Sequence, residues 1–340
     1  MRILLKRLVF LKNFPRNEAE MGKVVIAGGS GFLGQALARS LLGDGWDVIL
    51  LSRFNQNSAQ VGRTVQWNAK DLGQWTKELE GAKALLNLSG RSIDCRHTKK
   101  NKEEILNSRI NATSVLGEAI RSCILPPTIW LNASTATIYP DRRGDLAPCD
   151  ETSLIDAPGF SEEVGRIWEK TFFKFKHENV RQIALRISIV LGNEGGAFPV
   201  LRKLTKIGLG GSQGPGSQWI SWLHIDDWVK VVRFLIDQPT ISGPVNLASP
   251  KPLTNSDFMA IMREHFAPFG LGLPAPSVAI YFGSIFLGTP PDLILKSRKV
   301  ISQKLAKFDY LFEFPNFKDC LLYTSPSPRD QRGSRMPSSA

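Results

Sequence analysis

A glycine-rich turn between an apolar strand and a helix is the feature that most constrains how this chain folds. Residues 24–27 form the continuous apolar run that a buried parallel strand needs, and Gly-Gly-Ser-Gly-Phe-Leu-Gly follows at residues 28–34. In such a turn the first glycine permits a tight bend, the second lets the backbone approach a pyrophosphate, and the third lets the next helix pack closely on the strand. The turn therefore predicts a dinucleotide site that includes Gly28, Gly31, Phe32, Leu33 and Gly34.

The end of the second predicted strand indicates which dinucleotide binds. This strand covers residues 46–51, and Ser52 and Arg53 follow it. An NAD site usually has Asp or Glu here to bind the ribose 2′-hydroxyl, whereas a carboxylate would repel a 2′-phosphate. A guanidinium group holds that phosphate through paired hydrogen bonds. We therefore expect NADP(H) as the cofactor, with Ser52 and Arg53 at its 2′-phosphate; the alternative is a solvated loop arginine.

Four more short apolar runs predict further strands, at residues 65–67, 84–88, 129–133 and 186–192. The run at 84–88 leads into Ser89 and Gly90. Open α/β sheets bind their ligands at the carboxyl ends of parallel strands, so we expect this segment at the ligand site. Gly90 would let the chain pass close to the cofactor.

Together with Asn-Ser-Arg-Ile-Asn-Ala-Thr at residues 107–113, these motifs resemble the extended short-chain dehydrogenase/reductases. The closer similarity is to an atypical branch, the epimerase-family proteins, also called nucleoside-diphosphate-sugar epimerases or, in bacteria, cell-division inhibitors. The resemblance covers residues 21–319 and implies an α/β fold, with a Rossmann-type doubly wound parallel sheet that binds NADP(H). The implied NADP-binding domain covers residues 21–192, with a return segment near 222–250, and a smaller substrate region covers residues 193–319.

The resemblance also assigns cofactor contacts on later segments. Val190 is expected near the nicotinamide, and Leu88 and Ser89 near the adenosine half. Glu104 and Arg109 match family positions at the cofactor pocket, although both equally fit an exposed charged helix. The implied contacts on these segments are Leu88, Ser89, Gly90, Glu104, Arg109 and Val190.

The residues expected to carry the chemistry depart from the superfamily pattern. Its active members use Ser or Thr together with Tyr-x-x-x-Lys on one helix face to move a proton to or from the substrate oxygen. Thr135 falls on the Ser/Thr position and Tyr139 on a site-lining aromatic position. The Tyr and Lys positions fall on Phe160 and Val164, which cannot exchange a proton. The other candidate acids or bases are Tyr139, Glu162, Glu163 and His224, each of which more often packs or faces solvent.

Two functions remain open from the sequence. The first is an NADP(H)-dependent oxidoreductase or epimerase-like enzyme that acts on an unidentified small molecule, with Thr135 orienting the substrate. The alternative is a non-catalytic NADP(H)-binding regulatory protein, which the absence of the Tyr and Lys pair permits. The sequence gives no indication of the oligomeric state.

Charge and apolar patterns argue against several other classes of protein. His224, Asp226 and Asp227 lack a further metal ligand nearby, and we expect one of the two carboxylates to cap a helix at residues 228–236 instead, so no metal site is predicted. The longest apolar run, at residues 278–287, is shorter than the ~18 residues of a membrane span. Despite a formal net charge of +12, no nucleic-acid-binding motif occurs.

The two ends of the chain carry much of this positive charge. Residues 1–20 have a net charge of +3 and residues 320–340 of +2, which leaves +7 on residues 21–319. Residues 1–20 fit either a basic amphipathic organelle presequence or an upstream extension, so the expected location is the cytoplasm, a mitochondrion or a plastid. Residues 320–340 resemble a translated sequencing adaptor followed by a patternless polar segment, and we expect a non-native tail there.

Overall fold

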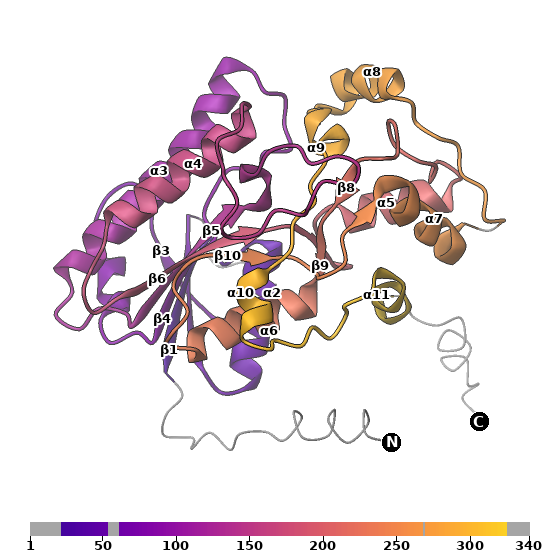
Figure 1. Ribbon diagram of the computed structural model, residues 1–340. Coiled ribbons are helices and arrows are strands. Elements are labelled where there is room, and N and C mark those ends of the chain that lie inside the picture. Colours follow the sequence, from indigo (N-terminus) through magenta and orange to yellow (C-terminus); the bar gives the residue numbers. More distant parts are fainter. Residues whose placement is uncertain (1–21, 54–60, 268, 325–340) are drawn as a thin grey trace, which may run out of the picture.

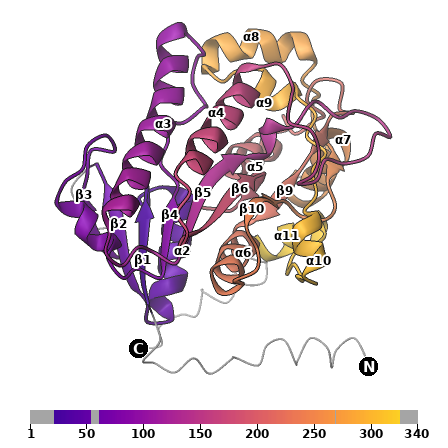
Figure 2. The ribbon, with the colours of Figure 1, turned by 60° about the vertical axis from the view of Figure 1, so that its left-hand side comes forward.

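A seven-stranded parallel sheet forms the centre of the molecule (Figures 1 and 2). The computed structural model describes residues 22–53, 61–267 and 269–324. The strand order is β10-β6-β5-β4-β1-β2-β3, and every pairing within this sheet is parallel. This is the doubly wound Rossmann arrangement, so the predicted fold class is confirmed. The strands are β1 (Lys23–Ala27), β2 (Asp47–Ser52), β3 (Arg63–Gln66), β4 (Ala84–Asn87), β5 (Ile129–Thr135), β6 (Arg181–Ile187) and β10 (Gly243–Leu247).

Helices cover both faces of the sheet, with α2 and α6 on one face and α3 and α4 on the other (Figures 1 and 2). Val24 and Ile26 of β1 pack in the core beneath α2 and α6, whereas Val25 and Ala27 pack beneath α3 and α4. Successive side chains of a strand point to opposite faces, so burial on both sides explains why β1 is apolar at four consecutive positions. The helices are α2 (Phe32–Gly43), α3 (Lys99–Ser122), α4 (Phe160–Lys174) and α6 (Ile225–Asp237).

A smaller region with its own apolar core lies beside the sheet, on the right in Figure 1. Phe198, Trp222, Phe258 and Phe317 are buried together in this core. Strands β7 and β9 pair in parallel there, and β8 and β11 pair antiparallel. The remaining elements are η2 (Gln74–Leu79), η3 (Ala136–Ile138), β7 (Ile189–Leu191), α5 (Phe198–Lys206), β8 (Trp219–Ile220), β9 (Trp222–His224), β11 (Leu253–Thr254), α7 (Asn255–Phe266), α8 (Ser277–Leu287), α9 (Asp292–Leu295), α10 (Gln303–Lys307) and α11 (Phe317–Thr324).

The strand predicted at residues 186–192 is divided into two strands. β6 ends at Ile187 in the central sheet, and β7 leaves that sheet to pair with β9. Ser188 marks the break, because its backbone N–H (3.1 Å) and its hydroxyl (2.7 Å) both donate to the carbonyl oxygen of Leu247 at the end of β10. The sequence alone does not show this separation, since it depends on a partner 59 residues away.

Helix α6 is capped differently from the sequence-based expectation. It begins at Ile225, and its N-cap is His224, whose Nδ1 accepts from the backbone N–H of Asp226 at 3.2 Å. The Asp227 carboxylate instead accepts from the backbone N–H groups of Glu313 (2.7 Å) and Phe314 (2.9 Å). Asp227 therefore fixes a C-terminal segment against α6, which corrects the prediction that Asp226 or Asp227 is the cap.

The predicted non-native tail lies partly within the described residues, and the predicted presequence lies wholly outside them. Helix α11 continues to Thr324, and Cys320 and Leu321 are buried in the core of the smaller region. Residues 1–20 and 325–340 lie outside the described residues, so the predicted leader and the non-native tail remain predictions. Within the described ranges, no helix is long and apolar enough to cross a membrane, and no group of three or more His, Cys, Asp and Glu side chains is placed to hold a metal ion.

Candidate cofactor site

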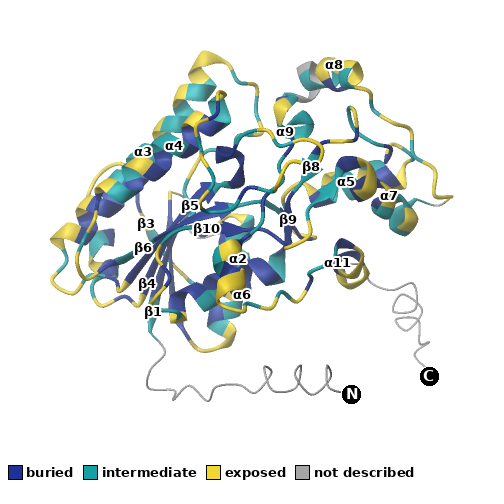
Figure 3. Ribbon diagram, in the orientation of Figure 1, coloured by how far each residue is buried: buried dark blue, intermediate teal, exposed yellow. Residues whose placement is uncertain are grey.

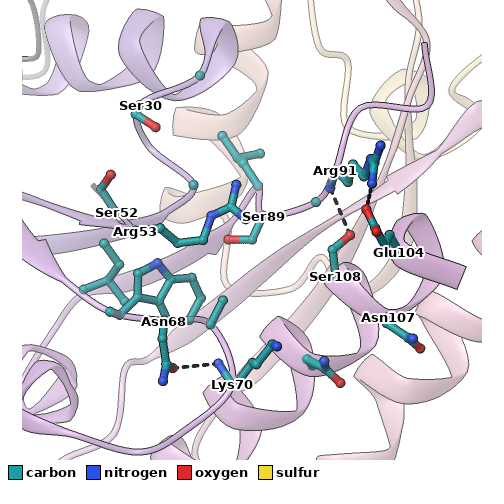
Figure 4. Close-up of a pocket in the computed structure, with 18 residues that line it drawn as sticks. Ser30, Ser52, Arg53, Asn68, Lys70, Ser89, Arg91, Glu104, Asn107 and Ser108 are labelled. Atoms are coloured by element: carbon teal, nitrogen blue, oxygen red, sulfur yellow. Dashed lines mark hydrogen bonds and ion pairs between the residues drawn. The ribbon is translucent and has the colours of Figure 1, made fainter. Parts of the chain in front are cut away.

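A cavity of about 740 Å³ opens at the carboxyl ends of β1, β2 and β4 (Figure 4). Its walls are the glycine-rich turn, the end of β2, the loop after β3, the loop after β4 and one face of α3. Of the predicted cofactor residues, the lining includes Gly28, Gly31, Ser52, Arg53, Leu88, Ser89, Gly90 and Glu104. The topology therefore brings together residues that are spread over more than 70 positions of the sequence.

The glycine-rich turn has the backbone geometry of a phosphate cradle. Gly28 has a φ of +74°, and a Cβ there would lie 2.9 Å from the backbone of Leu88 and Ser89. A Cβ at Gly34 would lie 2.6 Å from the Cα and carbonyl oxygen of Gly29, so the third glycine allows the close packing of α2 on the turn. α2 begins with Gly31 as its N-cap, without a side-chain capping bond. The first N–H groups of α2 therefore have no capping side chain, as at helix ends that bind anions.

A buried amide network fixes the loop after β4. The Asn87 amide nitrogen donates to Asn132 Oδ1 at 2.7 Å, and Asn87 Oδ1 accepts from the backbone N–H of Ser89 at 3.0 Å. Thr113 joins this network and accepts from the Trp168 indole at 3.0 Å. The role of Asn87 was not predicted from the sequence, in which the available signal was a polar residue at the end of an apolar strand.

Helix α3 supplies one wall of the cavity and also a side chain that holds the neighbouring loop at residues 90–91 in place. Glu104 lines the cavity and forms an ion pair with Arg91, which also lines it. Arg109 lies behind this wall: its guanidinium donates to the carbonyl oxygens of Arg91 (3.0 Å) and Ile105 (2.9 Å) and lies over the Trp168 ring. Burial lowers the pKa of Arg109 to about 10. Arg109 thus holds the loop at residues 90–91 in place, whereas Glu104 faces the ligand space.

The loop after β3 forms a wall that sequence analysis did not identify. Ser52 pairs with Gln66, and the backbone N–H of Trp67 donates to the Ser52 carbonyl at 3.0 Å, so this loop runs beside the end of β2. Trp67, Asn68, Ala69 and Lys70 all line the cavity. No sequence motif marks these residues, because their position depends on the pairing of β3 with β2.

The other predicted site residues lie outside this cavity. Val190 is buried in the core beneath α2 and α6, and Leu33 packs against the same core. The Phe32 ring packs beneath Gly192 and Gly195 and lines a second cavity of about 440 Å³ between α2 and α6. Thr135, at the end of β5, accepts from the backbone N–H of Thr137 through its hydroxyl at 3.1 Å.

Tyr139 is enclosed in the core, with only 2% of the residue exposed. Its hydroxyl accepts from Arg186 at 2.7 Å and donates to Asn246 Oδ1 at 2.8 Å. Burial raises the pKa of Tyr139 to about 12, although Arg186 and Asn246 act in the opposite direction. The Tyr139 hydroxyl therefore belongs to a buried network, and Tyr139 lines neither of the two cavities. Its expected site-lining position stays a prediction.

Comparisons with known proteins agree with this geometry. Residues 24–164 match the NAD dependent epimerase/dehydratase family. Epimerase family protein YfhF of Bacillus subtilis (strain 168) is 31% identical over 300 residues, which cover 88% of this chain and 96% of that protein. The chain belongs to the epimerase family. It has the family's NAD(P)-binding fold. The resemblance to epimerase-family proteins that the sequence motifs indicate is therefore confirmed.

Solved structures of related proteins share this fold. Human epimerase family protein SDR39U1 (isoform 2), crystallised with NADPH, has a TM-score of 0.74 and 25% identity, covering 92% of this epimerase-family chain and 100% of that one. A nucleoside-diphosphate sugar epimerase from Corynebacterium glutamicum has a TM-score of 0.71 and 25% identity, covering 98% of this chain and 64% of that one. MoeE5, solved with UDP-glucose and NAD, is 16% identical with a TM-score of 0.68 and is similar in fold alone.

Proposed function

We propose that this epimerase-family protein binds NADP(H) in the 740 Å³ cavity and acts on a small molecule as an oxidoreductase or epimerase-like enzyme. The observation that carries the proposal is the end of β2, where Ser52 and Arg53 line the cavity in the place where an NAD site has a carboxylate. The human relative solved with NADPH supports the same choice of cofactor.

The residues of the cavity fit such a cofactor. Gly28, Gly31 and the first turn of α2 would hold the pyrophosphate, and Arg53 the 2′-phosphate. Leu88 and Ser89 would lie beside the adenosine half. Cations at Arg53, Lys70 and Arg91 outnumber the carboxylate of Glu104 in the lining, as suits a polyanionic ligand. When bound, the cofactor supplies or accepts a hydride.

Replacing Arg53 by aspartate tests the cofactor. We expect Arg53→Asp to weaken NADPH binding by more than about tenfold and NADH binding much less, because the variant loses a charge-assisted pair with the 2′-phosphate and adds a like charge. Titration of protein fluorescence with each nucleotide measures both constants. Arg143→Asp, an exposed site outside the cavity, makes the same charge change and should leave both constants unchanged. An equal loss for NADPH and NADH would refute the 2′-phosphate role.

The second candidate function is a non-catalytic NADP(H)-binding regulatory protein. It is favoured by Phe160 and Val164, which occupy the positions of the superfamily's Tyr and Lys. Phe160 packs edge-on against the His97 ring and beneath the Lys102 ammonium, and Val164 is buried. Neither side chain exchanges a proton, and the Tyr139 hydroxyl is enclosed. In the enzymatic proposal, Thr135 orients the substrate, Val190 lies near the nicotinamide, and another group moves the proton.

Hydride turnover separates the two functions. Purified protein is incubated with NADPH and a panel of carbonyl compounds, and oxidation is followed by the loss of nicotinamide absorbance. It is also incubated with NADP⁺ and a panel of nucleotide sugars, and the products are separated by chromatography, because an epimerisation returns its hydride and leaves the absorbance unchanged. The enzymatic proposal expects turnover that falls in a Thr135→Val variant with unchanged NADPH affinity. NADPH binding without turnover on any member of either panel would favour the regulatory protein.

A further inference from the structure

A charge-free stretch of sequence lies on the surface of the smaller region. Residues 267–291 contain no Asp, Glu, Lys, Arg or His, although charged residues make up 22% of the chain. Helix α8 occupies the middle of the stretch, and residues 269–276 connect it to the segment that follows α7. A stretch of this composition is normally buried, because protein surfaces in water carry charged side chains throughout.

Many of the residues of this stretch that the structure describes are exposed. On α8, Val278, Tyr281 and Phe282 have i, i+3, i+4 spacing and therefore share one face of the helix. Among the α8 side chains that the structure describes, only Ile280 is buried. A helix that is apolar on all sides is normally enclosed, whereas no part of the chain that the structure describes covers the outer side of α8. The exposed fractions are 87% for Phe269, 72% for Leu271, 68% for Leu273, 65% for Val278, 53% for Tyr281 and 63% for Phe282.

The segment that precedes α8 along the chain carries further exposed apolar side chains. The backbone of Leu273 donates to the Gly208 carbonyl (2.8 Å) and accepts from the Gly211 N–H (3.1 Å), so residues 269–275 run beside the end of α5. Ile207 and Leu209 are also exposed there. We call the exposed apolar side chains of residues 207–209 and 269–282 the apolar face. Figures 1 and 3 show α8 projecting from the edge of the molecule with exposed residues along it.

Exposed cations flank the apolar face on two sides. Lys203 and Lys206 are exposed on α5, directly before Ile207. Beyond α8 the charge is mixed: a Cβ at Gly288 would lie 3.8 Å from the Arg96 side chain and exposed lysines follow at residues 99–100, while the Thr289 hydroxyl donates to exposed Asp94 at 2.6 Å. Aromatic and aliphatic side chains flanked by Lys and Arg are typical of surfaces that bind the interface of anionic membranes.

We propose that the apolar face binds the surface of an anionic lipid membrane, with its aromatic and leucine side chains among the upper acyl chains and the flanking lysines at headgroup phosphates. α8 (Ser277–Leu287) is shorter than the ~20 residues that cross a bilayer, so the contact is peripheral. No residue of the apolar face lines either of the cavities described above. The proposal does not depend on the cofactor or on catalysis.

Vesicle co-sedimentation of the full chain tests the proposal. We expect the protein to sediment with vesicles of phosphatidylcholine mixed with phosphatidylglycerol, and less with phosphatidylcholine alone. Phe282→Asp should lower the partition coefficient by at least about tenfold, because a phenyl ring that the proposal places among the acyl chains is replaced by a charge. Ile124→Asp is the matched control, since Ile124 is 89% exposed at the end of α3, away from the apolar face. Both variants should keep the urea midpoint of the wild type.

The cations give a second test. The double variant Lys203→Glu with Lys206→Glu should bind the anionic vesicles more weakly than the wild type does. Its weak binding to phosphatidylcholine alone should be unchanged. Added salt should reduce the difference in anionic-vesicle binding between the wild type and the double variant. Wild-type protein that stays in the supernatant with both kinds of vesicle would overturn the proposal. An equal loss of binding in Phe282→Asp and Ile124→Asp would also overturn it. Dimers without vesicle binding, dissociated by Phe282→Asp, would assign the apolar face to a second copy of the chain.

Discussion

Arg186→Leu is expected to lower the free energy of unfolding by about 3–5 kcal/mol, because it leaves the Glu169 carboxylate charged and buried without its partner. The Arg186 and Glu169 side chains are 4% and 7% exposed. Two N–H groups of the guanidinium donate to the two carboxylate oxygens at 2.8 Å, and a third donates to Tyr139. The Ser134 hydroxyl also donates to Glu169, at 2.6 Å. Urea unfolding followed by circular dichroism measures the change.

The control for this prediction is an exposed ion pair. Lys318 and Glu264 are 2.7 Å apart, with side chains 62% and 61% exposed. Lys318→Met should change the free energy of unfolding by less than about 1 kcal/mol, because water solvates both groups in the unpaired state. Equal losses in Arg186→Leu and Lys318→Met would show that the buried pair contributes no more than a surface pair.

Gly34→Ala is expected to destabilise the protein by about 1–3 kcal/mol and to weaken NADPH binding by at least about tenfold. The new Cβ would lie 2.6 Å from backbone atoms of Gly29, and backbone cannot rotate away as a side chain does. The start of α2 must therefore move, which displaces the N–H groups proposed to hold the pyrophosphate. Urea unfolding and NADPH titration measure the two effects.

Gly43 provides the matched control on the same helix. A Cβ at Gly43 meets no atom within 4 Å, and its φ is not positive. Gly43→Ala should leave NADPH binding unchanged and stabilise the protein by up to about 1 kcal/mol, because alanine restricts the unfolded chain more than glycine does. Destabilisation of similar size in both variants would contradict the packing role of Gly34.

The local features of the nucleotide-binding half were predictable from sequence. The glycine-rich turn and the apolar runs at β1, β2, β4 and β5 each contain their own signal, because a strand buried on both faces needs continuous apolar residues. The third strand was predicted at residues 65–67 and lies at Arg63–Gln66. β3 lies at the edge of the sheet and has only half-buried and exposed residues, so its apolar pattern is weaker than that of the central strands.

The features that sequence analysis missed depend on distant partners. Tyr139 is enclosed by Arg186 and Asn246, which are 47 and 107 residues away. α6 begins at Ile225, so His224 is its N-cap, and Asp227 in the first turn accepts from the backbone of residues 313–314 instead. The loop at residues 67–70 reaches the cavity through pairing of β3 with β2. No local pattern indicates any of these contacts.

The position of β10 at the edge of the central sheet has a consequence for biosynthesis. β10 (Gly243–Leu247) pairs along the outer edge of β6 (Arg181–Ile187), after the chain has passed through α5 and α6. While the chain is being made, the backbone N–H and C=O groups along that edge of β6 stay unpaired until residue 247 has emerged from the ribosome. An unpaired strand edge is a template for aggregation. Nascent chains from which β6 has emerged and β10 has not should therefore expose this edge and bind chaperones.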